Sequence, residues 1–316
     1  MYHHDRFFLH NAHTSNMEKE EEEEEKKEMI MLMGDDVLDD HADSMNMPSL
    51  SKSEDVRTIL GHTMPDRTIE SCAVGRSILV NVLGSIWPPS KLTDSRKDAN
   101  LPPYPVDSKD GHVYPLKILE KSKPGYVVVS IGWNDIKCCF ARSRDPKEVR
   151  RMLRENRFRN DLDKLMSELK SRVKKTILVF PNLPRAVRMN KMYMLPTMKD
   201  MQTIASDAFN HFAFVAKKYN IPLIDLSRTI NPYMGSLYRS DDPTRLSTKA
   251  RYHVASIVSY AISNHKFDDD TNECVIYSGT GPIRSDRNKD GKFSSTLLEH
   301  YLFECKSNAG SGCVVS

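Results

Sequence analysis

The 316-residue sequence has no apolar run that approaches the length of a transmembrane helix. Residues 1–8 also lack the apolar core of a secretory signal. The sequence shows no internal repeat, which a solenoid would require. The cysteines are few and show no metal-ligand spacing. They are Cys72, Cys138, Cys139, Cys274, Cys305 and Cys313. We therefore expect no metal or cofactor, and we expect reduced thiols in a cytoplasmic or nuclear protein.

Charge is nearly balanced overall, at a formal +3, but it is unevenly spread. Residues 18–28 are almost wholly charged, and a segment of that kind cannot bury enough apolar surface to order itself. Residues 1–28 are therefore predicted to be a disordered acidic leader. Residues 137–175 hold fourteen Lys and Arg against six Asp and Glu, an excess of eight positive charges.

Short apolar runs alternate with helical patterns between residues 29 and 265. The strands are predicted at residues 29–33, 67–74, 127–131, 176–180 and 222–226. The helices are predicted at residues 53–60, with Ser51 or Ser53 as cap, and at 78–86, 115–120, 146–172, 197–219 and 247–263. This order predicts an α/β domain with a doubly wound, five-stranded parallel sheet. Residues 91–114 are predicted to be an irregular loop, and residues 266–316 a mostly flexible tail.

The loops after the strands carry a four-part pattern. They are Gly34-Asp35-Asp36, Gly75-Arg76-Ser77, the loop Gly132-Trp133-Asn134-Asp135, and Asp242-Pro243-Thr244-Arg245 before the last helix. In this order the pattern resembles the SGNH (GDSL-like) hydrolase superfamily. The resemblance implies a flavodoxin-like three-layer sandwich with its site at the carboxyl ends of the strands.

The same resemblance implies a degenerate active site. It places the nucleophilic serine at Asp36 and the catalytic histidine at Arg245, while Gly75, Asn134 and Asp242 match the family's oxyanion donors and catalytic aspartate. The family's chemistry needs a hydroxyl and an imidazole base. Because a guanidinium holds its proton at any ordinary pH, Arg245 cannot serve as that base.

The two exchanged residues are also complementary in charge. A carboxylate at Asp36 and a guanidinium at Arg245 would form a bidentate ion pair in the crevice. The alternative is that both side chains point to solvent. Either way, the sequence predicts a catalytically impaired domain. An active esterase or acyl hydrolase with an atypical site is the alternative reading.

Basic residues share one side of the predicted helix at 146–172. They are Lys147, Arg150, Arg151, Arg154 and Arg157, extended by Arg142 and Arg144. Clustered arginine is typical of phosphate-backbone binding, so single-stranded RNA is a candidate partner. The insect germ-plasm protein Oskar offers an analogy at the level of the fold: its SGNH-like C-terminal domain lacks the hydrolase residues and binds RNA. The alternatives are a solvated helix face and a scaffold that binds only protein partners.

The sequence ends in Cys313-Val314-Val315-Ser316, a C-a-a-X pattern of the farnesylation type. A single prenyl chain on Cys313 would give weak peripheral membrane association. The alternative is an unmodified tail. Residues 286–291 match the start of an EF-hand loop, but Leu297 stands at its twelfth position, so a polar turn is predicted instead.

Overall fold

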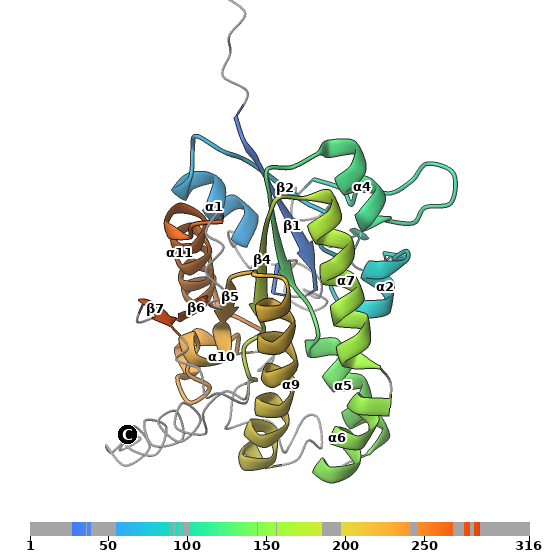
Figure 1. Cartoon of the computed structure of the whole chain (residues 1–316), viewed down its shortest axis with the longest axis vertical. Helices are drawn as coiled ribbons and strands as arrows, with labels where there is room; N and C mark the ends of the chain where they lie inside the picture. Colours follow the sequence, from blue (N-terminus) through green and yellow to red (C-terminus); the bar gives the residue numbers. More distant parts are fainter. Residues whose placement is uncertain are drawn as a thin grey trace, which may run out of the picture.

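A seven-stranded sheet organises the chain (Figure 1). The computed structural model describes residues 27–35, 37–38, 55–88, 90, 93–94, 97, 102–143, 145–155, 157–184, 197–240, 245–267, 275–278 and 281–284. The strands are β1 (Met29–Gly34), β2 (Thr68–Ser71), β3 (Tyr126–Ser130), β4 (Lys175–Phe180), β5 (Leu223–Asp225), β6 (Val275–Ser278) and β7 (Gly281–Arg284). Their order is β2-β1-β3-β4-β5-β6-β7, and only the β6–β7 pairing is antiparallel.

All five predicted strands form, and their spatial order 2-1-3-4-5 is the flavodoxin-like one. The prediction of five strands in all is wrong. β6 pairs in parallel with β5, and β7 pairs with β6, so both extend the sheet within the predicted tail.

Helices cover both faces of the sheet, which confirms the three-layer expectation (Figure 1). One layer contains α1 (Val56–Thr63), α10 (Leu226–Thr229) and α11 (Thr248–Asn264). The other contains α2 (Leu79–Leu83), α4 (Pro115–Ser122), α5 (Trp133–Arg142), α6 (Pro146–Glu155), α7 (Phe158–Arg172) and α9 (Met198–Lys218). Successive strand residues feed opposite cores, because side chains alternate along a strand: Val127 and Val129 face the second layer, and Val128 faces the first.

Helix starts follow local capping. Asp55 caps α1 by accepting a hydrogen bond from the Thr58 amide at 2.7 Å, so the predicted caps Ser51 and Ser53 are wrong. Thr197 and Ser247 cap α9 and α11, close to the predicted starts. The predicted helix at 78–86 ends earlier, at Leu83.

The predicted helix at 146–172 is two helices, α6 and α7. Arg157 lies between them with a left-handed φ of 58°. The buried residues Leu153 and Phe158 are five positions apart, and five residues rotate a helix by about 140° beyond a full turn. The break therefore restores Phe158 to the face that packs on the sheet.

Several predicted features lie outside the described residues. These are the leader up to residue 26, Asp36, Arg144, Asp242, and the C-terminal segment from residue 285, with Cys313 and the polar turn. Within the described ranges, no helix has both the length and the apolar character needed to cross a bilayer.

Candidate functional site

The ends of β1, β2 and β3 meet at one edge of the sheet, as the loop motifs predict. The Asp35 amide donates to the Ser130 carbonyl at 2.8 Å, and the Val74 amide donates to the Gly34 carbonyl at 3.0 Å. Gly34 has φ 125°, and a Cβ there would lie 1.7 Å from the Ser130 oxygen. Only glycine therefore lets β1 leave the sheet this close to β3.

The third motif is not a loop, contrary to the prediction, but the start of α5. Gly132 is its N-cap at φ 108°, and a Cβ there would meet the rings of Phe212 and Phe158 at 3.1 and 3.2 Å. Asn134, 6% exposed, donates from its amide nitrogen to the Ser77 carbonyl at 3.2 Å. The structure thus brings Asn134 to the loop that contains Gly75, and the amide ties that loop to α5.

Asp135 is a residue of this edge whose role the sequence did not reveal. Both of its carboxylate oxygens accept from the Leu79 amide, at 3.2 and 3.3 Å, at the start of α2. Burial raises the pKa of Asp135 to about 7, and the Leu79 hydrogen bond opposes the shift only in part. The carboxyl group therefore changes charge near neutral pH.

Replacing Asp135 with asparagine is expected to change how stability depends on pH. The pKa of Asp135 is raised in the folded state, so its contribution to folding is greatest at low pH and is lost as pH rises from about 4 to about 7. The stability of the wild type relative to Asp135→Asn should fall by up to about 4 kcal/mol across that range. Urea denaturation at pH 4 and pH 8 measures this, and a pH-independent difference would contradict the assignment.

Arg245 is buried, 6% exposed, in the segment before α11. Its carbonyl accepts from the Arg239 amide at 3.0 Å, and the neighbouring Tyr238 hydroxyl donates to the Leu183 carbonyl, just past β4, at 2.7 Å. Arg245 therefore does not point to solvent. Because Asp36 lies outside the described residues, the ion pair between the two stays a prediction.

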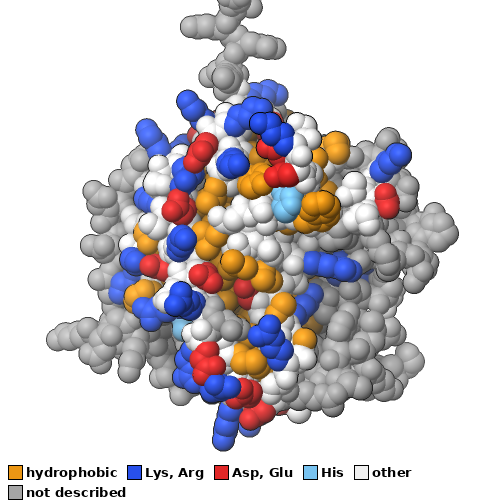
Figure 2. All heavy atoms as spheres, turned by 90° about the vertical axis from the view of Figure 1, so that its right-hand side faces the viewer, with side chains coloured by type: hydrophobic (Ala, Val, Ile, Leu, Met, Phe, Trp, Pro, Cys, Tyr) orange, Lys and Arg blue, Asp and Glu red, His pale blue; other side chains and the backbone are white. Residues whose placement is uncertain are grey.

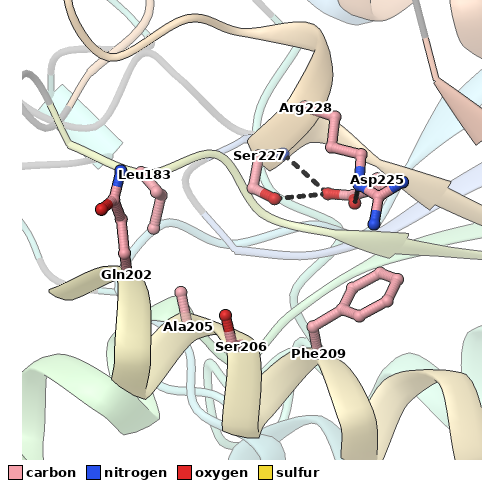
Figure 3. Close-up of a pocket in the computed structure, with 8 residues that line it drawn as sticks. All are labelled: Leu183, Gln202, Ala205, Ser206, Phe209, Asp225, Ser227 and Arg228. Carbon is pink, nitrogen blue, oxygen red and sulfur yellow. Dashed lines mark hydrogen bonds and ion pairs between the residues drawn. The ribbon is translucent and has the colours of Figure 1, made fainter. Parts of the chain in front are cut away.

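A small pocket lies between α9 and α10 at the end of β5 (Figure 3). The Asp225 carboxylate, 1% exposed, accepts from the Ser227 hydroxyl at 2.6 Å and pairs with the Arg228 guanidinium at 3.0 Å. Burial raises the pKa of Asp225, and the charge of Arg228 opposes this. The cavity of about 20 Å³ has room for roughly one water molecule. Asp225 is the N-cap of α10 and also accepts from the Ser227 amide at 3.0 Å, so it anchors the start of that helix.

The predicted basic residues separate into two groups. Arg150 pairs with Asp207 of α9, and Arg151 pairs with Glu148 and Glu155 along α6. The others in the described ranges are exposed and have no carboxylate within ion-pair distance there: Arg142, Lys147, Arg154 and Arg157. Figure 2, which faces the side carrying α4, α7, α5 and α6, shows Lys and Arg interleaved with Asp and Glu.

The structure also tests the cysteines and the possible metal ligands of the described residues. No three His, Cys, Asp or Glu side chains gather there in a metal-binding arrangement. Cys72, Cys138 and Cys139 are free thiols, and burial raises the pKa of Cys72 to about 12. Adjacent Cys138 and Cys139 do not pair with each other.

Solved structures similar to this chain include SGNH and GDSL-like proteins. An acetylxylan esterase, Axe2 from Geobacillus stearothermophilus, is 14% identical with a TM-score of 0.41, covering 77% of this chain and 97% of its own. A putative GDSL-like lipase from Parabacteroides merdae is 12% identical with a TM-score of 0.45, covering 75% of this chain and 96% of its own. A putative SGNH hydrolase from Slackia heliotrinireducens is 12% identical with a TM-score of 0.44, covering 74% of this chain and 98% of its own.

The likeness concerns the fold, and at these scores no statement about activity follows from it. No family model and no curated protein matches the sequence.

Proposed function

We propose that this chain is a single-stranded RNA-binding module built on a hydrolase-like fold, without ester-hydrolase activity. One observation carries the proposal. Arg142, Lys147, Arg154 and Arg157 are exposed along α5, α6 and the turn before α7, and no carboxylate in the described ranges neutralises them. Cations of this kind are available to phosphate groups, since binding need not first break an ion pair.

The state of the crevice argues against hydrolysis. The guanidinium of Arg245 is buried and keeps its proton, so it cannot accept one from a nucleophile. The Asn134 amide, an oxyanion donor by resemblance, donates to the Ser77 carbonyl. An amide nitrogen carries two N–H donors, so this bond alone does not remove Asn134 as an oxyanion donor, and the expected loss of hydrolysis follows from the missing base at Arg245.

Two wild-type assays test the proposal together. A fluorescein-labelled single-stranded RNA of twelve nucleotides should bind in an anisotropy titration, with an affinity that falls as salt rises. Short-chain p-nitrophenyl esters should show no turnover above a buffer blank.

The alternatives give different results. Ester turnover that disappears in Asn134→Ala would identify an active hydrolase and contradict the proposal. A scaffold that binds only protein would be silent in both assays.

A further inference from the structure

One side of α9 packs against α6 and α7. We call this contact the seam, and an ion pair lies at each of its two ends. Asp207 pairs with Arg150 of α6 at one end, and Lys218 pairs with Asp163 of α7 at 2.8 Å at the other. Figure 1 shows α9 running beside α7, with α6 below. The charges at both ends of the seam are therefore balanced within the protein.

The middle of the seam contains aromatic rings and an imidazole in place of an ion pair. His211 and Phe214 lie one turn and two turns beyond Asp207 on the same side of α9. The His211 ring meets Phe158 edge-on, with centroids 6.2 Å apart. The Arg159 guanidinium lies 3.7 Å from the centroid of Phe214, a ring that is 45% exposed. An exposed stack of a phenyl ring and a guanidinium thus interrupts the seam.

Two arginines lie near the half-buried His211. Burial lowers the pKa of His211, the charges of Arg159 and Arg154 lower it further, and the charge of Asp207 opposes them in part. Both arginines are exposed, and neither has a carboxylate within ion-pair distance in the described ranges. The middle of the seam therefore combines an exposed aromatic ring with two available cations and an imidazole.

We propose that this place, formed by Phe214, Arg159, Arg154 and His211, holds one nucleotide of a single strand. The base stacks on the Phe214–Arg159 pair, and Arg154 and His211 hold the adjoining phosphate. The inference rests on the proposed function, and it names where a base, rather than the backbone alone, contacts the protein.

The chemistry favours a nucleotide over a phosphorylated or acidic peptide. Bases are planar and stack on aromatic rings and on guanidinium planes, as single-strand-binding proteins use them. A peptide phosphate or carboxylate would use the cations but would leave the exposed ring without a matching flat surface. Arg154 also belongs to the basic residues of α6, so the backbone can continue from the stack toward Lys147.

Phe214→Leu tests the stacking role without changing charge. Its affinity for the labelled twelve-nucleotide RNA should fall about tenfold, since one base–aromatic stack is lost. The slope of log affinity against log salt should stay the same, because no phosphate contact is removed. Phe214→Tyr keeps a ring and should retain wild-type affinity.

The matched control is Tyr252→Leu on α11 in the opposite layer, where Tyr252 is 46% exposed. It should bind like the wild type. Wild-type binding by Phe214→Leu would overturn the stacking site while leaving the proposed function intact. Absence of RNA binding by the wild type would overturn both, and circular dichroism of each variant distinguishes loss of binding from loss of fold.

Discussion

Gly34→Ala is expected to destabilise the folded state by at least about 4 kcal/mol, a large share of a domain's total stability. The new Cβ would stand 1.7 Å from the Ser130 carbonyl oxygen, which is backbone and cannot swing aside. The φ of 125° is also poorly tolerated by any residue with a side chain. Urea denaturation followed by circular dichroism measures the loss.

Gly61→Ala is the matched control for this substitution. Gly61 lies inside α1, and a Cβ there meets no atom within 4 Å. Alanine should therefore stabilise the chain by about 0.5–1 kcal/mol through helix propensity. Equal effects at the two glycines would contradict the close approach of β1 to β3.

Arg228→Met should cost about 3–5 kcal/mol, because it leaves the buried Asp225 carboxylate without its counter-charge. The pKa of Asp225 is already raised by burial, and removing Arg228 raises it further. The variant is thus most stable at low pH, where Asp225 is protonated, and loses stability as pH rises. Denaturation at pH 5 and pH 8 should show the larger loss at pH 8.

The double variant Asp225→Asn with Arg228→Met separates charge from packing. Asparagine has no charge, so the double variant leaves no unpaired buried charge. It should therefore recover part of the lost stability and show little of the pH dependence. A double variant as unstable as Arg228→Met at pH 8 would mean that the arginine acts through packing, against Phe209 for example.

The central strands could be predicted because burial on both faces leaves continuous apolar runs, as in Val127–Val129. β6 could not, since Val275-Ile276-Tyr277 is a short run in a polar segment, and its strand state depends on pairing with β5. α5 begins at a glycine N-cap with no side-chain hydrogen bond, so the usual sequence signal for a helix start is absent.

For the basic residues too, contacts within one helix could be predicted from the sequence, and contacts between helices could not. The pairing of Arg151 with Glu148 and Glu155 follows helical spacing and is readable from the sequence. The pairing of Arg150 with Asp207 joins residues 57 positions apart, and only the packing of α6 on α9 brings them together. The stack of Arg159 on Phe214 depends on the packing of α7 on α9 in the same way.

The salt dependence of RNA binding by two charge-reversal variants tests the central claim most directly. Lys147→Glu with Arg154→Glu changes exposed residues of α6, and Lys249→Glu with Lys266→Glu makes the same change of charge at exposed positions at the start of α11 and just beyond its end. The first variant should bind more weakly, with a slope of log affinity against log salt shallower by about 0.7 per lost phosphate contact. The second should keep the wild-type slope, and equal slopes in both variants would contradict RNA binding through α6.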